Sequence, residues 1–460
     1  MFPLSSQSAV AFVAAQAIVR RLRGEGHLAY LAGGCVRDML LGREPNDYDV
    51  ATSATPEIVL DLFPRTFAVG AHFGVVLVSA EFDGQPTLTE VATFRSDGVY
   101  SDGRHPDEVK YTTSAEEDVQ RRDFTINGLL LDPERLDAAK PAASAVLDFV
   151  GGVADLEGGI LRAIGNPERR FEEDHLRLLR AVRFAARYEF QIAPATFSAM
   201  RSLTAKIQAV SRERVRDELT RMLTEGHARR AFELLDESGL LAQVLPEVVR
   251  LKGVEQPPQY HPEGDVWTHT LMLLAQLEVG CPMTLAWGAL LHDIGKPATF
   301  QAPTGPGDRI RFNGHVDVGV AIAAEICRRL RFSGEETSQI LALVENHMRF
   351  ADTPHMKKAT LKRFFRLDRF PEHLALHRMD CLAGSGNLDH YNYTRERYES
   401  MPEEQVRPKP LITGRELIAA GYQPGAGFKA MLHAVEEAQL EGTIQTPDEA
   451  MELIRTQFRV

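Results

Sequence analysis

The sequence predicts an α+β protein in which an N-terminal α/β head, residues 1–150, is followed by helices alone. Within the head, short β-branched runs alternate with helical patterns and turn residues, as in FGVVLVSAEF, LTEVATF and AVLDFV. From about residue 160 onward, apolar residues recur at spacings of three and four, as in HLRLLRAVRFAARYEF and RVRDELTRMLTEG. The change of period marks the end of the head.

Breaks in the helical pattern divide the remainder. LKGVEQPPQYHPEGD, residues 251–265, is the most proline-rich break and predicts entry into another domain, whereas QAPTGPGDR, residues 301–309, is typical of a loop within it. We therefore expect four parts: a head at 1–150, a helical neck at 151–255, a helical body at 256–400 and a helical tail at 401–460.

Composition excludes several classes of protein. Of 460 residues, 44% are hydrophobic and 25% charged, as in an ordinary globular protein with a sizeable core. The formal net charge of −12 excludes a uniformly basic surface, so any nucleic acid must be bound by local basic segments. Residues 201–230 and 349–378 each contain eight lysines and arginines, although a solvated helix face explains either segment as well.

Cysteine usage and hydropathy indicate a cytoplasmic protein. The four cysteines lie far apart, without a CxxC pair, which favours a reducing compartment. No apolar run approaches the roughly 18 residues that a membrane span needs. In the N-terminal segment AVAFVAAQAIV the arginines follow the apolar run, whereas in a signal peptide they precede it. We expect no membrane association and no obligate protein partner.

The segment LAGGCVRDMLLGREPNDYDV, residues 31–50, combines a glycine pair, an Arg–Asp and two aspartates one residue apart. Glycines let the backbone approach phosphate oxygens, and Arg37 adds a planar charged fork. Asp47 and Asp49, on a predicted strand, point to the same face of the sheet. Magnesium binds through such carboxylates together with substrate phosphates. The segment predicts a site for a triphosphate and its magnesium ion, although an isolated DxD is most often a solvated turn.

Two later segments extend this site. Glu90 lies on a strand, where it is either a third carboxylate beside the metal or part of a structural salt bridge. The polar, glycine-containing residues 93–107 that follow are expected to be mobile. In EEDVQRRDFTINGLLLD, which by its charges alone is typical of a helix surface, we assign phosphate and ribose contacts to Arg121, Arg122, Asp123 and Asn127.

FEEDHLRLLRAVRFAAR, residues 171–187, predicts base selection. Asp174 and Arg177 lie three residues apart on a predicted helix and therefore share a face, which Arg180 and Arg183 continue. Cytosine and adenine both present an amine for the carboxylate beside a ring acceptor for the guanidinium. Guanine and uracil present the reverse order, which leaves buried groups unpaired at about 1 to 3 kcal/mol each. Without the upstream motif, an i,i+3 salt bridge of about 0.3 kcal/mol would explain the pair.

In this order, GGCVRD, DYDVAT, RRDFTINGL, EEDHLRLLR and SRERVRDELTRML resemble the motifs of bacterial class II tRNA nucleotidyltransferases, a group that includes bacterial poly(A) polymerases. The resemblance covers essentially the whole chain and implies a nucleotidyltransferase-type head. The magnesium ligands that it implies are Asp47 and Asp49. The nucleotide contacts that it implies are Gly34, Arg37 and Arg122. The protein template that it implies for CTP and ATP is Asp174, Arg177, Arg180 and Arg183.

A second set of polar residues lies in the helical half. His269, the adjacent His292 and Asp293, and Asp380 follow the order H…HD…D within apolar helical patterns. Buried imidazoles and carboxylates need partners, which a transition metal or magnesium supplies. The order resembles HD phosphohydrolase domains and implies an HD-type body that hydrolyses a phosphate or phosphodiester, for instance a 2′,3′-cyclic tRNA end. An isolated His–Asp is more often a satisfied core pair. The residues that would complete a binuclear centre are His315 and His347.

The leading hypothesis is CCA addition, in which a metal-activated tRNA 3′-hydroxyl attacks the α-phosphate of CTP or ATP and pyrophosphate leaves with a second metal. CC-only members of the family lack much of the segment corresponding to residues 93–107, which disfavours that product; A-only addition stays open. Poly(A) polymerases usually carry a basic C-terminal extension and no HD set. From another class, the alternative is an HD phosphohydrolase with a regulatory nucleotide-binding head. We expect the tail, residues 401–460, to bind tRNA.

Overall fold

The computed structural model describes residues 6–67, 74–82, 85–97, 109–137 and 142–458. Residues 98–107 of the segment expected to be mobile lie outside this part of the chain. The contacts divide the protein into two units, Met1–Pro246 and Glu247–Val460. The four-part division predicted from the sequence stays a prediction.

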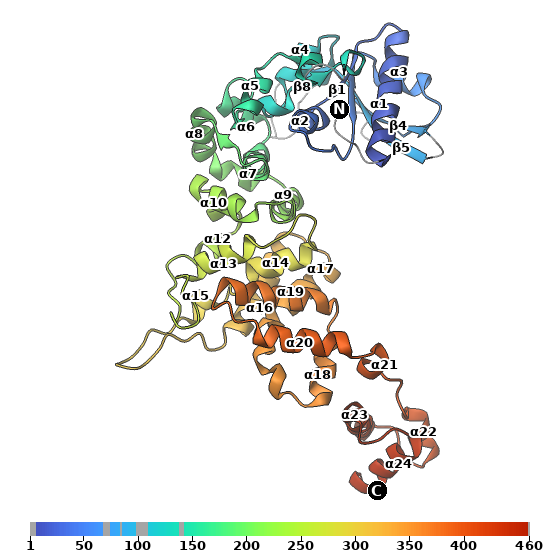
Figure 1. The fold of residues 1–460 in the computed structure, drawn as a ribbon, viewed down its shortest axis with the longest axis vertical. Coiled ribbons are helices and arrows are strands. Elements are labelled where there is room, and N and C mark those ends of the chain that lie inside the picture. Colours follow the sequence, from blue (N-terminus) through green and yellow to red (C-terminus); the bar gives the residue numbers. More distant parts are fainter. Residues whose placement is uncertain (1–5, 68–73, 83–84, 98–108, 138–141, 459–460) are drawn as a thin grey trace. The chain divides into compact units, whose positions relative to one another are not determined.

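The first unit contains a mixed sheet of seven strands in the order β3-β4-β5-β2-β1-β8-β9 (Figure 1). β2 and β5 run parallel, and the other neighbouring strands run antiparallel. The strands are β1 (Ala29–Ala32), β2 (Asp49–Thr52), β3 (Thr66–Phe67), β4 (Val75–Phe82), β5 (Gln85–Thr93), β8 (Leu129–Leu131) and β9 (Val146–Asp148). Two short pairs join β6 (Arg95–Asp97) to β7 (Val109–Tyr111) and β10 (Ile160–Leu161) to β11 (Gln191–Ile192).

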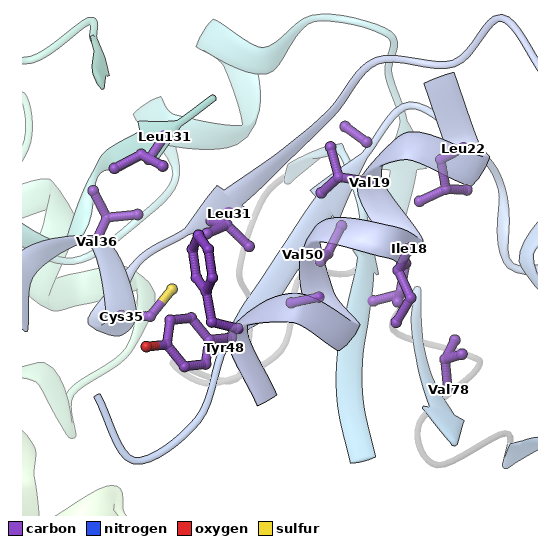
Figure 2. Packing of buried hydrophobic residues seen from close by; sticks show 14 of the residues in the cluster. Ile18, Val19, Leu22, Leu31, Cys35, Val36, Tyr48, Val50, Val78 and Leu131 are labelled. Carbon is purple, nitrogen blue, oxygen red and sulfur yellow. The ribbon is translucent and has the colours of Figure 1, made fainter. Parts of the chain in front are cut away.

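The core of the head lies between the sheet and α1 (Ser6–Gly24). Ile18 and Leu22 of this helix belong to the same buried cluster as Val50 of β2, with Ile18 beside Val50 in Figure 2. Tyr48 and Val50 are both buried in this core, at 2% and 0% exposure. Because side chains alternate along extended chain, their burial directs Asp47 and Asp49 to the other side. Packing of the apolar residues thereby orients the two aspartates.

Helices make up nearly all of the first unit beyond β9. The helices α2 (Gly34–Leu40), α3 (Pro56–Leu62) and α4 (Ala115–Gln120) come before β9, in the head, and the helices beyond β9 begin with α5 (Gly152–Glu157). They are followed by α6 (Pro167–Glu173), α7 (Arg177–Arg187), α8 (Pro194–Ser202), α9 (Arg212–Thr224), α10 (Ala228–Ser238) and α11 (Leu240–Val244). The prediction of a helical remainder after an α/β head is therefore confirmed, with the β10–β11 pair as the exception.

The described residues of the second unit form helices joined by loops, with one isolated β-bridge between Gln301 and Arg311. After α12 (Pro246–Val249), its central helices are α13 (Val266–Leu274), α14 (Met283–Leu291), α15 (Lys296–Thr299), α16 (His315–Arg329), α17 (Gly334–Asn346) and α19 (Phe370–Ala383). The others are α18 (Lys358–Phe365), α20 (Asp389–Ser400), α21 (Glu403–Val406), α22 (Gly414–Ala419), α23 (Ala426–Glu441) and α24 (Pro447–Gln457). Among all the helices of the described chain, none combines the length and apolar character needed to cross a membrane.

Candidate active site and metal centre

A cavity of about 760 Å³ lies in the first unit. It is lined by residues of the glycine turn before α2, of β2 and β5, of the Arg-Arg-Asp segment, and of α7 and α9. The residues assigned from the sequence to the nucleotide and to the head metal all line it: Gly34, Arg37, Asp47, Asp49, Arg122, Asp174, Arg177, Arg180 and Arg183. The fold thus gathers them in one place, while their individual roles stay predictions.

Three carboxylates line one part of the cavity. Asp47 directly precedes β2, Asp49 begins it, and Glu90 lies on the parallel neighbour β5. Burial, and then the negative charges of Asp47 and Glu90, raises the pKa of Asp49 to about 7. A divalent cation relieves this repulsion, so the donor set fits magnesium. Glu90 forms no ion pair with any other described residue, which favours the carboxylate cluster over the salt bridge that the sequence also allowed.

The glycine turn brings the backbone against Arg122. Gly33 has φ of 71°, which a residue with a side chain rarely adopts, and a Cβ added there would lie 2.9 Å from Arg122 Nη1. Arg122 donates to Asp118 Oδ2 at 3.1 Å and to the carbonyl of Asn127 at 3.4 Å. Because the Arg122 side chain can move, the backbone conformation (φ 71°, ψ −124°) is what requires glycine as the first residue of the GGCVRD motif.

Asp174 and Arg177 do not share a helix face, so that prediction is wrong. Asp174 has extended backbone (φ −143°, ψ 106°) and ends α6, whereas α7 begins at Arg177. The Asp174 side chain accepts a hydrogen bond from the Leu176 amide at 3.0 Å. Such a local bond competes with continuation of α6, and the next helix, α7, begins only at Arg177. The two residues line the cavity from either side of a break.

Neither residue forms the i,i+3 salt bridge that the sequence offered as the alternative. Asp174 Oδ2 accepts from Arg214 of α9 at 3.0 Å. Arg177 donates to Glu173 at 2.8 Å and to the Arg121 carbonyl at 3.0 Å. Separate partners therefore hold the carboxylate and the guanidinium in the cavity wall.

A ladder of alternating charges lies behind them. Arg180 donates to Asp123 at 2.9 and 2.7 Å. Arg183, 4% exposed, pairs with Glu218 at 2.7 Å and with Glu225 at 3.1 Å. Both arginines line the cavity and are engaged by acids, and their assignment to the template for CTP and ATP stays a prediction.

Arg214 and Arg221 of α9 and Glu225, which directly follows this helix, also line the cavity, while Glu218 of α9 pairs with Arg183. Arg214 was only counted within a basic segment, and Glu218 and Glu225 were not singled out. A signal was present: Arg214, Glu218, Arg221 and Glu225 are spaced by four, three and four residues, which places charges of alternating sign on one helix face.

In the second unit, the predicted metal ligands converge on Asp293. Its carboxylate oxygens lie 3.1 Å from His292 Nε2, 3.9 Å from His269 Nε2, 3.8 Å from His315 Nε2 and 3.7 Å from His347 Nε2. Asp380 Oδ1 lies 3.0 Å from His269 Nε2. Helices α13, α14, α16, α17 and α19 supply these groups or directly precede them.

The chemistry of these donors fits a divalent cation. Nδ1 of His292, His315 and His347 each lies against a backbone carbonyl, at 2.9, 2.9 and 2.6 Å, and must carry the proton because a carbonyl only accepts. The buried Nε2 atoms of His315 and His347 have no hydrogen-bond partner among the described residues, whereas Nε2 of His292 faces the Asp293 carboxylate. Burial lowers the pKa of His347 to about 4, which keeps its ring neutral. Buried imidazole nitrogens around a carboxylate form a donor set that fits a divalent metal.

Two residues around this centre were missed. Glu263 Oε1 lies 2.6 Å from His269 Nδ1 and 2.9 Å from His261 Nδ1. Lys296 Nζ lies 2.7 Å from Asp293 Oδ2. Glu263 belongs to the proline-rich segment 251–265, which the sequence led us to treat only as a domain break.

The basic segment 349–378 binds the tail. Arg363 pairs with Glu437 and Arg366 with Glu436, both at 2.5 Å, and Lys362 donates to the Leu440 carbonyl at 2.8 Å. These ion pairs join α18 to α23. Two of the eight cationic residues of this segment are therefore paired with acids of the tail.

Three family models match successive parts of the chain: a poly A polymerase head domain at residues 29–162, a probable RNA- and SrmB-binding site of polymerase A at 189–251, and an HD domain at 266–385. The multifunctional CCA protein of Nitrosococcus oceani is 34% identical over 407 residues, covering 86% of this chain and 93% of that protein. The chain belongs to the CCA-adding enzyme family. The family predicted from the sequence motifs is thus confirmed, and with it the nucleotidyltransferase head and the HD domain.

Other members of the family match in length or in structure. The CCA-adding enzyme of Levilactobacillus brevis is 29% identical over 442 residues, 96% of each chain. The crystal structure of the Bacillus stearothermophilus CCA-adding enzyme in complex with CTP superposes with a TM-score of 0.70 at 27% identity, over 97% of this chain and 98% of that one. The match to the Lactococcus lactis CCA-adding enzyme, 41% identical, spans about half of that protein, 54%. The two domain types make divalent metal dependence a property of the family.

Proposed function

We propose that the protein adds CCA to the 3′ end of tRNA, using CMP and AMP from CTP and ATP. The observation that carries the proposal is one cavity of about 760 Å³ lined by both Asp47 and Asp49 and by Asp174 and Arg177. A metal-binding carboxylate pair and a base-selecting pair are the two parts that nucleotide addition without a nucleic-acid template requires. The CTP complex of the Bacillus stearothermophilus relative supports the same ligand class.

Different residues of the cavity bind the metal and the triphosphate. Magnesium, held by Asp47 and Asp49 with Glu90 beside them, would supply activation of the tRNA 3′-hydroxyl and neutralisation of the leaving pyrophosphate. Arg37 and Arg122, with the backbone at Gly34, bind and orient the triphosphate. In this way the reacting groups are held in line before the transfer.

Base selection follows from the edge that the protein presents. Asp174 accepts from the exocyclic amine of cytosine or adenine, and Arg177 donates to the neighbouring ring nitrogen. Guanine and uracil would place a carbonyl against the Asp174 carboxylate and a ring N–H against the Arg177 guanidinium. Each buried group left unpaired in this way costs about 1 to 3 kcal/mol. Arg180 and Arg183, engaged by acids, keep the edge in place.

The proposal is tested by incorporation of labelled nucleotides into tRNA. We expect the wild type to incorporate CMP and AMP but neither GMP nor UMP, and Asp47→Ala to incorporate nothing while keeping its melting temperature. A variant with Asp61→Ala, an exposed aspartate of α3, serves as the matched control and keeps full activity. Normal incorporation by Asp47→Ala would refute the assignment. A-only addition and poly(A) synthesis use the same cavity and are separated from CCA addition by the sequence of the product.

A second activity is favoured by the centre around Asp293. We propose that His269, His292, Asp293 and Asp380 hold a divalent metal, a transition metal or magnesium, with His315 and His347 completing a binuclear centre. The observation behind this proposal is the set of buried Nε2 atoms without partners. A bound metal would supply an activated water for hydrolysis of phosphate esters. The protein would then be an HD phosphohydrolase in addition to a nucleotidyltransferase; a regulatory role for the head alone leaves the carboxylates and base-selecting pair unexplained.

Metal analysis of the purified protein tests this centre. We expect the wild type to contain metal in the second unit and both His292→Ala and Asp293→Ala to lose it. His355→Ala, which removes an exposed histidine of the same unit, is the control and keeps the metal. Equal metal content in all four proteins would contradict the proposal.

Two further expectations belong to the same proposal. The tail, residues 401–460, binds tRNA. The protein acts in the cytoplasm, where its four unpaired cysteines stay reduced.

A further inference from the structure

One carboxylate oxygen joins the end of α7 to the arginine of the glycine turn. Tyr188 directly follows α7, and its hydroxyl donates to Asp38 Oδ1 at 3.0 Å. The same oxygen accepts from Arg37 Nε at 2.9 Å. Tyr188 is 5% exposed and Asp38 9% exposed, so water competes little for these bonds. The two residues are 150 positions apart in the sequence, and no motif suggested the contact.

The ring of Tyr188 also contacts the Arg37 guanidinium. The guanidinium carbon lies 4.6 Å from the Tyr188 ring centroid and 5.3 Å from that of Phe184, at cation–π distance. Phe184 lies on α7, one turn before Tyr188. The rings of Phe184 and Tyr188 thus fix the plane of the Arg37 guanidinium, and Asp38, held by the Tyr188 hydroxyl, fixes the position of its Nε.

These contacts leave one donor group of Arg37 for a ligand. Nε donates to Asp38 and Nη1 to Asn127 Oδ1 at 2.5 Å. Nη2 has no acceptor within the described chain, and it lies 3.5 Å from where a Cβ on Gly34 would be. Arg37 and Gly34 both line the cavity. An anion beside the glycine turn would therefore meet Nη2.

Tyr188 also moderates the negative charge of Asp38. A carboxylate that lines a triphosphate site repels the ligand unless hydrogen bonds neutralise it. Burial raises the pKa of Tyr188 to about 12, so its hydroxyl keeps the proton that it donates.

We propose that Tyr188 is a positioning residue: it fixes Arg37 for the phosphate groups of the incoming nucleotide and ties the base-selecting helix α7 to the phosphate site. This inference rests on the proposed nucleotide function of the cavity. Because Arg37 would contact the phosphate groups and not the base, removal of the Tyr188 side chain should weaken the binding of CTP and the binding of ATP by the same factor.

Two substitutions separate the contributions of the ring and the hydroxyl. Tyr188→Phe keeps the ring over Arg37 and loses the bond to Asp38, and Tyr188→Leu loses both. Tyr30→Leu is the matched control, because the Arg23 guanidinium lies 5.1 Å from the Tyr30 ring and neither residue lines the cavity. The measurements are the Kd of inorganic tripolyphosphate with magnesium, by calorimetry, and KM and kcat for CTP and ATP with tRNA.

We expect Tyr188→Leu to bind tripolyphosphate about 10-fold more weakly, Tyr188→Phe about 3-fold more weakly, and Tyr30→Leu as the wild type does. The KM values for CTP and ATP rise by matching factors. An unchanged tripolyphosphate Kd in Tyr188→Leu overturns the inference, as does an equal loss in Tyr30→Leu. A KM change confined to one nucleotide also overturns it, because the role would then concern the base. If the wild type incorporates neither CMP nor AMP, the proposed function fails, while tripolyphosphate binding still decides the role of Tyr188.

Discussion

Arg180 donates two hydrogen bonds, at 2.9 and 2.7 Å, to a single carboxylate oxygen of Asp123. The other oxygen of Asp123 accepts from the Asn127 side chain at 3.0 Å. Burial alone would raise the pKa of Asp123, but Arg180, Asn127 and Arg177 lower it to about 2. This pair joins the Arg-Arg-Asp segment to α7 and closes the back of the cavity.

Asp123→Asn should destabilise the first unit strongly. The substitution leaves the Arg180 guanidinium without its buried anion, which costs about 3 to 5 kcal/mol. A carboxyl with a folded pKa of about 2 stabilises the protein above its unfolded pKa of about 3.9, and that stability is lost as the pH falls through 2. The difference in the free energy of unfolding between the wild type and Asp123→Asn should therefore become smaller below pH 4. Urea unfolding at several pH values measures it, with Asp217→Asn, in an exposed pair, as the control. If Asp123→Asn and Asp217→Asn lost the same free energy of unfolding, the buried Asp123–Arg180 pair would contribute no more stability than an exposed pair.

Asp49→Asn should stabilise the metal-free protein while abolishing its response to magnesium. The pKa of Asp49 is raised to about 7, so its ionised form is disfavoured in the folded state at pH 8. Removal of the charge should raise the melting temperature by about 2 to 4 °C. Thermal unfolding with and without magnesium measures both effects. We expect magnesium to stabilise the wild type and Asp61→Asn but not Asp49→Asn; equal stabilisation of all three would place the metal elsewhere.

His373 should make the second unit sensitive to acid. It is 1% exposed beside Phe370, and burial, with Arg349 adding to the effect, lowers its pKa to about 4. Between the unfolded pKa of about 6.5 and pH 4, the unfolded chain binds a proton that the folded chain does not. Stability is therefore lost as the pH falls through this range, by up to about 3 kcal/mol.

The test compares chemical unfolding at pH 7.5 and 4.5. His373→Phe should lose less stability on acidification than the wild type does, and His355→Phe, at an exposed position, should behave as the wild type does. If the pH dependence is the same in all three proteins, His373 is not the titrating group.

The tail acids should mask a basic surface. Glu436 and Glu437 pair with Arg366 and Arg363 through partly exposed side chains, each pair contributing only about 0.2 to 1 kcal/mol. The double variant Glu436→Gln and Glu437→Gln should stay folded but bind nonspecific RNA more tightly, with a steeper dependence on salt. Filter binding at several salt concentrations measures this, with Glu452→Gln as the control. Unchanged RNA affinity would mean that α18 offers no surface for nucleic acid.

The sequence pattern was sufficient to predict the position of a side chain where a single physical rule determines it. The alternation that buries Tyr48 and Val50 predicts the direction of Asp47 and Asp49. The H…HD…D order predicts the residues that converge on Asp293, because buried imidazoles and carboxylates need a common partner.

The features that could not be predicted from the sequence depend on contacts between residues far apart in the chain. Helical periodicity continues through residues 171–187, but the backbone is extended at Asp174, whose side chain accepts from the Leu176 amide between the two helices. The partner of Asp174 is Arg214, 40 positions later, and depends on how α9 packs against α7. The bond of Tyr188 to Asp38 likewise spans 150 positions.

The central claim is that this cavity builds CCA on tRNA. The most direct measurement offers tRNA ending at the discriminator base, at C or at CC, with CTP and ATP separately and together, and sequences the products. We predict CC from CTP alone on the first substrate, a single A from ATP alone on tRNA ending in CC, and complete CCA with both nucleotides. If no C were added to tRNA ending at the discriminator base or at C, and A were added only to tRNA ending in CC, the account would be contradicted. A run of A on any of the three ends would contradict it as well.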